Sequence, residues 1–379
     1  GWAYYRDNNY AILKRSDVLE VISAGSFNIC IGGTHGKTTI TTMVAHLLRH
    51  TGFGCNAFLG GISVNYDTNF WSSDNNVSVI EADEYDRSFL KLSPDIAVVS
   101  AMDPDHLDIY GTAESLEDAF IAFAGKVRAE GLLLSKFGLK RGRELKAPQQ
   151  LTYSAQNEAA DIHTRNIRMN DGSYHFDLAV DGKLIDKLVL NMGGMHNVEN
   201  AAAAIAIASR LKIKDDAIRL AIAEFKGVKR RFEYIIKNER LVFVDDYAHH
   251  PEELRALITG ARSLFNGRKC TIVFQPHLFS RTKDLADDFA ASLDLADEII
   301  LLPIYPAREL PMKGVSSEMI VERMKNKHIA VVAKEKLVEY LKTNFAAKQN
   351  REFPELLITA GAGDIDAMVE PIKNILNGN

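Results

Sequence analysis

The segment IGGTHGKTTITTM, from Ile31 to Met43, carries residues that could bind phosphate. Gly36, Lys37 and Thr38 fit the end of the pattern G-x-x-x-x-G-K-[ST], in which the lysine reaches the β- and γ-phosphates and the hydroxyl binds Mg²⁺. The glycine expected at the start of that pattern is replaced by Ile31. A glycine-rich turn with a solvated lysine is the alternative. The context disfavours it, because an apolar run at 27–32 precedes the loop and a helical apolar stripe follows it.

Acidic residues follow the next two predicted strands. The run VSVI (77–80) leads into Glu81 and then Asp83, Glu84 and Asp86, while VVSAMDPDHLD (98–108) carries His106 among aspartates. Ligands of open α/β sheets bind at the carboxyl ends of strands, where carboxylates beside a phosphate loop suit Mg²⁺. Glu81 is the best candidate because it directly follows the apolar run. For each of the other three acidic residues, a solvated turn is an equally good interpretation.

Polar clusters recur later in the chain. Asn197 and Asn200 in MHNVEN are three residues apart and therefore share one helical face, and capping explains one of them at most. Two more clusters follow predicted strands, VDDYAHHPEE (244–253) and FQPHLFSRTKD (274–284). Their polar residues include Asp246, Tyr247, His249 and Arg281. We interpret the glycines of ITAGAGDID (358–366) as a turn near the same site.

The elements that must position these residues alternate between strand and helix, which predicts parallel sheets. Between 151 and 190, the turn sequences NDG and DG predict hairpins instead. We therefore expect an α/β protein: a central parallel-sheet ATPase domain of the P-loop type, with an added antiparallel hairpin region, followed by a Rossmann-like α/β C-terminal domain. The predicted strands are 27–32, 77–80, 95–100, 131–135, 241–245, 271–275, 298–302, 329–333 and 356–360, and the predicted helices include 114–130 and 197–211.

Length and composition indicate a globular protein of more than one domain. The chain has 379 residues, enough for about two or three domains, and 46% of them are hydrophobic. Its net charge is −5 and it has no basic run, so we expect no nucleic-acid partner. No apolar segment is long enough to span a membrane, and no secretory signal opens the chain. Three cysteines without ligand spacing indicate reduced thiols in a cytoplasmic protein.

The motifs, taken in order, resemble those of the Mur ligases of peptidoglycan synthesis over essentially the whole chain. They are GGTHGKTT, EADE, DHLD, HNVEN, RRFE, DDYAHHP, QPH and YPAREL. The loop of this family is G-T-[HN]-G-K-[ST], without the distant first glycine. Ile31 is therefore expected to be the last residue of a strand, and the loop is complete for this family.

The resemblance implies an ATP-dependent ligase that joins L-alanine to UDP-N-acetylmuramate in the synthesis of peptidoglycan precursors. ATP would phosphorylate the muramoyl carboxylate, because a carboxylate is a poor electrophile for an amine. The L-alanine amine would then attack the acyl phosphate and displace phosphate. Two anions must meet in the first step, so Mg²⁺ and Lys37 would neutralise them.

The resemblance also implies roles for individual residues. Mg²⁺ would be held by Thr38 and Glu81, and a second ion by Glu81 and His106. Tyr247, His249 and Arg281 would face the amino-acid and muramoyl groups, and catalysis would depend on Lys37, Glu81, His106 and His249. ATP would be bound by Gly33, Thr34, His35, Gly36, Lys37, Thr38, Thr39, Asn197, Asn200, Arg231 and Asp246. We expect Lys37 to face the surface, so that Lys37→Ala abolishes ligation with little loss of stability.

The sequence departs from the family pattern in two places, and each departure leads to a prediction. Many members have QPHR where this chain has QPHL, so Leu278 cannot contact a carboxylate and Arg281 would do so alone. The resemblance also divides the chain into a remnant of an N-terminal UDP-binding domain (1–23), a central ATP-binding domain (24–226) and a C-terminal ligase domain (227–379). That division predicts weak binding of UDP-N-acetylmuramate by this chain.

Three alternatives stay open. A recycling ligase of the same family would attach an intact tripeptide, although FQPHLFSRT and IYPAREL favour L-alanine. A P-loop ATPase or kinase switch without ligation should lack the second α/β unit. A nucleotide-binding fragment without turnover is the third. The sequence does not predict an oligomeric state.

Overall fold

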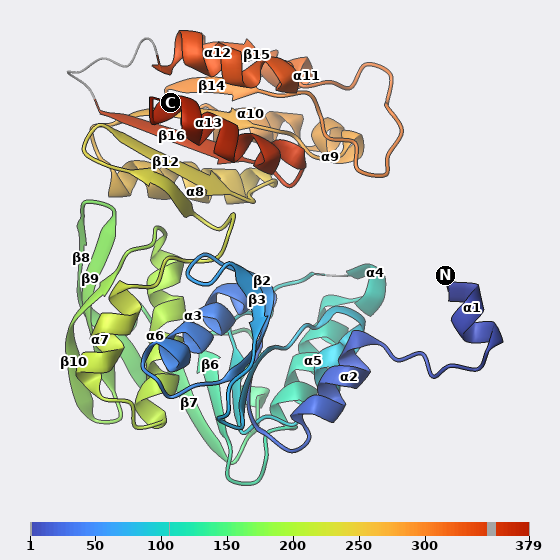
Figure 1. Cartoon of the computed structure of the whole chain (residues 1–379), viewed down its shortest axis with the longest axis vertical. Helices are drawn as coiled ribbons and strands as arrows, with labels where there is room; N and C mark the ends of the chain where they lie inside the picture. The colour runs from blue at the N-terminus through green and yellow to red at the C-terminus, as the bar shows by residue number, and fades with distance from the viewer. Residues whose placement is uncertain (1, 106, 347–353, 379) are drawn as a thin grey trace. The chain divides into compact units, whose positions relative to one another are not determined.

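The computed structural model describes residues 2–105, 107–346 and 354–378, and the chain forms two compact units (Figure 1). Unit 1 comprises residues 1–168, 174–191 and 195–225, and unit 2 comprises residues 169–173, 192–194 and 226–379. Each unit is built on its own sheet. None of the helices within the described ranges has the length and apolar character needed to cross a membrane.

Unit 1 contains a ten-stranded sheet in the order β10-β9-β8-β7-β6-β5-β1-β4-β2-β3. The central strand β1 pairs in parallel with β4 on one side and β5 on the other, so the carboxyl ends of these three strands meet at one edge. The strands are β1 (Phe27–Gly32), β2 (Asn56–Ser63), β3 (Thr68–Trp71), β4 (Val77–Glu81), β5 (Ile96–Val99), β6 (Leu132–Lys136), β7 (Gln149–Ser154), β8 (Ile162–Asn170), β9 (Ser173–Val180) and β10 (Lys183–Leu190).

Helices cover both faces of this sheet. On one face, Phe120 and Phe123 of α5 pack with Phe89 and with Cys30 of β1 in a buried apolar cluster. Side chains alternate along a strand, so Ile29 and Ile31 point to the other face, where α3 packs against α6. The helices are α1 (Trp2–Asp7), α2 (Arg15–Ser23), α3 (Lys37–His50), η1 (Tyr85–Lys91), α4 (Leu107–Tyr110), α5 (Ala113–Ala124), η2 (Gly142–Glu144), α6 (Met195–Arg210) and α7 (Asp215–Ala223).

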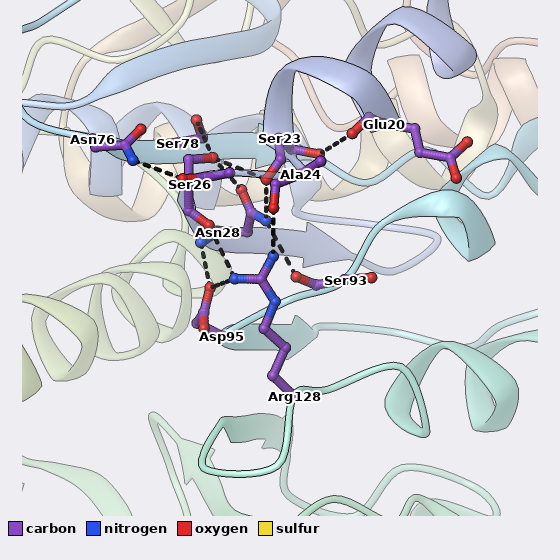
Figure 2. A network of polar contacts seen from close by, with 11 residues as sticks. Glu20, Ser23, Ala24, Ser26, Asn28, Asn76, Ser78, Ser93, Asp95 and Arg128 are labelled. Atoms are coloured by element: carbon purple, nitrogen blue, oxygen red, sulfur yellow. Dashed lines mark hydrogen bonds and ion pairs between the residues drawn. The ribbon is translucent and has the colours of Figure 1, made fainter.

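A hydrogen-bond network ties the segment that enters β1 to the amino-terminal edge of this sheet (Figure 2). The Arg128 guanidinium donates to the Ser26 carbonyl at 3.0 Å and to the Asp95 carboxylate at 2.9 Å. Asp95 also accepts the backbone N–H of Asn28 at 2.7 Å, and the Asn28 amide donates to the Ser23 carbonyl at 2.9 Å. The network therefore fixes the start of β1 at the edge opposite the phosphate loop.

Unit 2 contains a six-stranded sheet in the order β11-β12-β16-β13-β14-β15. β11 is antiparallel to β12, and the remaining neighbours are parallel. Its strands are β11 (Glu233–Lys237), β12 (Leu241–Asp246), β13 (Lys269–Phe274), β14 (Glu298–Leu301), β15 (Ile329–Val331) and β16 (Glu355–Ala360). The order makes β12, β16 and β13 direct neighbours, so their carboxyl ends also share one edge.

The unit 2 sheet is buried on both faces, as a parallel sheet requires. Phe243 and Val273 pack with Leu341 of α12 and Ile372 of α13 in one apolar cluster. On the other face, Phe274 contacts Phe289 of α10, with ring centroids 5.5 Å apart. The helices are α8 (Pro251–Leu264), α9 (Phe279–Asp284), α10 (Ala286–Leu293), α11 (Glu318–Val321), η3 (Lys334–Lys336), α12 (Leu337–Asn344), η5 (Asp364–Met368) and α13 (Val369–Leu376).

The predicted fold class is confirmed, including the hairpins. At Asp171–Gly172 and Asp181–Gly182 both residues of each turn have positive φ, the conformation that two-residue Asp-Gly turns favour. Several boundaries were wrong by one or two residues, and one was wrong by more. The helix predicted over 114–130 ends at Ala124, because Gly125 follows and the next two residues make i to i−3 turn bonds. β1 spans 27–32 as predicted, so the expectation that Ile31 is its last residue was wrong by one residue.

Candidate active site

The loop between β1 and α3 can form only with glycine at two positions. Gly33 has φ +137°, and a Cβ there would lie 2.1 Å from Ser100 Oγ. Gly36 has φ +82°, and its Cβ would lie 2.9 Å from Asn200 Oδ1. The Ser100 hydroxyl donates to the carbonyls of Gly32 and His35, which holds the loop against the end of β5. α3 begins at Lys37, so its free N–H groups face the loop as an anion site requires.

Lys37 does not face the surface, so that prediction was wrong. Its side chain is 13% exposed, and its ammonium donates to the Gly33 carbonyl and to Glu84 Oε1, each at 2.7 Å. The Glu84 side chain is fully buried, so the interpretation of this residue as part of a solvated turn was wrong. Tyr110 holds the Glu84 backbone by donating its hydroxyl to the carbonyl at 2.7 Å. The lysine is therefore held within the loop by a buried carboxylate.

Thr38 and Glu81 are adjacent, as the predicted Mg²⁺ site requires. The Thr38 hydroxyl donates to Glu81 Oε1 at 2.9 Å, and the backbone N–H of Gly60 donates to Oε2 at 2.8 Å. Mg²⁺ prefers oxygen ligands and takes few from the protein, because phosphate and water supply the rest. One hydroxyl and one carboxylate at the phosphate loop fit that preference. His106, the third predicted ligand, lies outside the described residues.

The remaining predicted nucleotide residues of unit 1 lie around the same loop. Asn197 and Asn200 are buried on α6, and the Asn200 amide donates to Asn197 Oδ1 at 3.1 Å. The Thr34 hydroxyl accepts the backbone N–H of Asp103 at 3.1 Å. Thr39 is buried in the first turn of α3, whereas His35 is exposed at the loop. The structure thus places Asn200 directly against Gly36 and leaves the imidazole of His35 accessible to a ligand.

In unit 2 the predicted residues gather where β12 ends. Asp246 accepts backbone N–H groups of Phe232 and Ala248, each at 2.7 Å, and burial raises its pKa to about 6. The side chain of Arg231 is exposed, and its charge acts to lower the pKa of Asp246. Tyr247 follows and is 44% exposed. An exposed arginine, a fixed carboxylate and an exposed phenol ring therefore share this strand end.

His249 is oriented by its neighbours. Its Nδ1 lies 3.0 Å from the Tyr247 carbonyl and 3.4 Å from Glu253 Oε2. Both of these oxygens can only accept a hydrogen bond. Nδ1 therefore carries the hydrogen in the neutral ring, which leaves the lone pair on Nε2. Pro251 starts α8 at N1 as predicted, and Glu253 accepts the backbone N–H groups of His249 and His250. The helix start thus orients a potential base.

Arg281 and His277 lie at the end of β13 with unused hydrogen-bonding atoms. Arg281 NH1 and His277 Nδ1 are buried and have no hydrogen-bond partner within the described ranges. Burial, with the charges of Arg281 and His249, lowers the pKa of His277. Buried polar atoms normally have partners, so the Arg281 guanidinium is suited to an anionic ligand group and the His277 imidazole to a polar one. Leu278 between them has φ +71°, an unusual conformation for leucine, and nothing in the structure explains why leucine stands there.

Two contributors were missed at the sequence level, and the partner of a third was not predicted. Gly60 supports Glu81, and Arg230 contacts Asp245, with Nε 3.3 Å from Oδ2. Glu84, an acidic candidate, pairs with Lys37. Only the acidic run after β4 gave any signal, because Glu84 was among its candidates. The other two contacts depend on strand pairing, which no local pattern encodes.

Comparison with known proteins agrees with this arrangement. Residues 31–208 match the family model for the Mur ligase middle domain, and residues 230–363 match that for the Mur ligase, glutamate ligase domain. A UDP-N-acetylmuramate–L-alanine ligase of Flavobacterium johnsoniae is 45% identical over 378 residues, covering 100% of this chain and 81% of the relative. The enzyme of that name from Porphyromonas gingivalis is 44% identical over 98% of this chain and 81% of its own length.

Solved structures give the same result. The UDP-N-acetylmuramate-alanine ligase of Thermotoga maritima has a TM-score of 0.77 and 27% identity, over 95% of this chain and 77% of its own. A murein peptide ligase from Psychrobacter arcticus shares the fold, with a TM-score of 0.62 and 19% identity over 100% of this chain and 83% of its own. The two family models, the identity of the relatives and the phosphate loop together show that this chain belongs to the Mur ligase family.

Proposed function

We propose that this chain catalyses the ATP-dependent joining of L-alanine to UDP-N-acetylmuramate. Two relatives that are 45% and 44% identical over nearly the whole chain carry that activity in their names. The single observation that carries the proposal is the geometry of Lys37, Thr38 and Glu81 at the start of α3. Because the proposed reaction consumes ATP, we expect it to take place in the cytoplasm, as a step in peptidoglycan precursor synthesis.

Unit 1 supplies the phosphate site in this proposal. Lys37 leaves Glu84 for the β- and γ-phosphates, whose charge the loop N–H groups and the α3 dipole also favour. Thr38 and Glu81 would hold Mg²⁺, which supplies charge neutralisation at the phosphates. A Mur-type ligase of Thermotoga maritima that shares this fold was solved with ADP, which supports a nucleotide at this site.

The chemistry then runs in two balanced steps. A carboxylate oxygen of the muramoyl group attacks the γ-phosphorus, and ADP leaves. The L-alanine amine attacks the carbonyl carbon of the acyl phosphate, the C–O bond to phosphate breaks, and the amine loses one proton. We assign that proton to Nε2 of His249, whose lone pair is free because Nδ1 faces the Tyr247 carbonyl.

Unit 2 supplies the site for the organic substrate. Arg281 NH1 needs an acceptor, and both substrates carry a carboxylate. A guanidinium fork binds a carboxylate with charge-assisted bonds. Arg281 therefore orients a carboxylate of the amino-acid or muramoyl group, in the absence of an arginine at Leu278.

Three parallel incubations test the proposal. The enzyme is supplied with ATP, Mg²⁺ and UDP-N-acetylmuramate, together with L-alanine, with the intact tripeptide, or with neither. We expect the mass of the L-alanine product, and phosphate release that depends on L-alanine. Product with the tripeptide alone would indicate the recycling reaction, and phosphate release without any amino component would indicate an ATPase.

A further inference from the structure

The side chain of Arg230 makes more contacts with the protein than a surface arginine usually does. Its side chain is 17% exposed and lies between the ends of β12 and β16. Nε donates to Asp245 Oδ2 at 3.3 Å, and the two terminal nitrogens donate to the carbonyls of Gly361 and Gly363. The guanidinium carbon also lies 5.2 Å from the ring centroid of Tyr247. One side chain therefore contacts both strand ends and the ring that follows Asp246.

The backbone around Arg230 is strained and held from both sides. Arg230 has φ +61° and Phe232 has φ +49°. Positive φ in such residues is strained and persists only where the surroundings enforce it. Here the Tyr247 N–H donates to the Arg230 carbonyl at 2.7 Å, and the Phe232 N–H donates to Asp246 Oδ2 at 2.7 Å. The exposed Arg231 lies between these two fixed points.

Asp245, the partner of Arg230, is also fixed by its neighbours. Asp245 is 1% exposed, and the Thr359 hydroxyl on β16 donates to its Oδ1 at 2.6 Å. Asp245 precedes Asp246 on β12, so a displacement of the backbone at Asp245 would also move Asp246. The contacts of Arg230 thus converge on Arg231 and Asp246, which the resemblance assigns to ATP, and on Tyr247, which it assigns to the amino-acid and muramoyl groups.

We propose that Arg230 is a positioning residue for ligation, which fixes Arg231, Asp246 and Tyr247 relative to the carboxyl ends of β12 and β16. Arg230 touches no substrate in this account. The proposal rests on the proposed function for its kinetic test, and ATP affinity gives a test without ligation. A misplacement of about 1 Å can cost about 100-fold in rate, so the effect should be large.

Arg268 provides a matched control in the same unit. It also donates to two backbone carbonyls, Glu355 at 3.5 Å and Asn238 at 3.2 Å, and its guanidinium lies 5.6 Å from the Phe265 ring. Its contact on β16 is at the first residue, Glu355, so it lies at the opposite end of that strand from Gly361. Arg230→Met and Arg268→Met therefore remove comparable contacts at the two edges of one sheet.

The experiment compares these two variants and Arg230→Lys with the wild-type enzyme. For Arg230→Met we expect KM for ATP and for L-alanine to rise at least tenfold, while KM for UDP-N-acetylmuramate stays within about twofold. Arg230→Lys should recover part of the loss, and Arg268→Met should leave all three constants unchanged. A purely structural role would lower only the amount of folded enzyme, so every KM would stay at its wild-type value.

Calorimetric titration with ATP separates this inference from the proposed function. Weaker ATP binding by Arg230→Met than by Arg268→Met supports the positioning role even if no L-alanine product forms. Equal ATP affinity in the two variants, with all three KM values unchanged, would overturn it.

Discussion

The ammonium of Lys37 lies 2.7 Å from Oε1 of Glu84, whose side chain is fully buried. The lysine that we propose for phosphate binding is thus paired with a carboxylate, which a bound nucleotide would replace. Removing one partner of a buried pair leaves the other charge unpaired, and that typically costs about 3–5 kcal/mol. The pair therefore links the stability of unit 1 to a residue that we propose is needed for catalysis.

We predict that Lys37→Met abolishes ligation and also destabilises the chain by about 3 kcal/mol, since Glu84 loses its partner. The double variant Lys37→Met with Glu84→Gln should regain most of the free energy of unfolding but no activity. Urea denaturation and phosphate release measure the two effects. Wild-type stability in the single variant would show that the buried pair contributes nothing.

The support of Glu81 by Gly60 gives a second prediction. A Cβ at Gly60 would lie 2.3 Å from the Glu81 carboxylate oxygens. Gly60→Ala should therefore displace the carboxylate and raise the Mg²⁺ concentration needed for half-maximal activity at least tenfold, as Glu81→Gln should. Gly25→Ala, where a Cβ meets nothing within 4 Å, is the control. An unchanged Mg²⁺ requirement in both Gly60→Ala and Glu81→Gln would exclude Glu81 as a Mg²⁺ ligand.

Substitution of Arg281 should affect activity much more than stability. Its NH1 is buried without a hydrogen-bond partner among the described residues, so Arg281→Met removes a poorly satisfied donor and should change the free energy of unfolding by less than about 1 kcal/mol. The lost charge-assisted bond should raise one substrate KM by about 10–100-fold. Arg262→Met, which loses only an ion pair with Asp297, controls for charge. Normal KM values for both substrates would contradict the assignment.

Burial of Asp245 predicts a dependence of stability on pH. Burial raises its pKa from 3.8 to about 7, and Thr359 and Arg230 oppose that rise. Because the folded pKa is the higher one, the protonated form favours folding. This contribution is present at low pH and is lost as the pH rises from about 4 to about 7. One pKa unit corresponds to about 1.4 kcal/mol, so the loss is on the order of 2–4 kcal/mol.

The measurement is the free energy of unfolding between pH 4 and pH 7 for wild type, Asp245→Asn and the exposed control Asp288→Asn. We expect a flatter profile for Asp245→Asn alone. Three parallel profiles would mean that the Asp245 carboxyl titrates alike in the folded and unfolded chains.

Much of the fold could be predicted from the sequence because its signals are local. Asp-Gly turns, the strand-loop-helix at Gly36 and the Pro251 helix start are each encoded within a few residues. The β2–β3 hairpin was missed, since the glycines at 60 and 61 interrupt its apolar pattern. The helix at 114–130 was overextended because apolar periodicity continued past Gly125, whose low helix propensity ended it.

The site was predictable only in its individual residues. Lys37, Thr38 and Glu81 could be named from the chain. The burial of Glu84 and the support from Gly60 follow from the order β1-β4-β2, which brings distant segments together. The contact of Arg230 with Asp245 depends on a positive φ at Arg230, and the side chain of Arg231 is exposed. No periodicity in the sequence indicates that backbone conformation.

The fate of one oxygen atom tests the central claim most directly. UDP-N-acetylmuramate labelled with ¹⁸O in its carboxylate is incubated with the enzyme, ATP, Mg²⁺ and L-alanine, and the released phosphate is analysed by mass spectrometry. Because the carboxylate oxygen attacks phosphorus and later leaves with it, we predict one ¹⁸O in the phosphate for each amide formed. Unlabelled phosphate released in step with ATP consumption would contradict the acyl-phosphate ligase account.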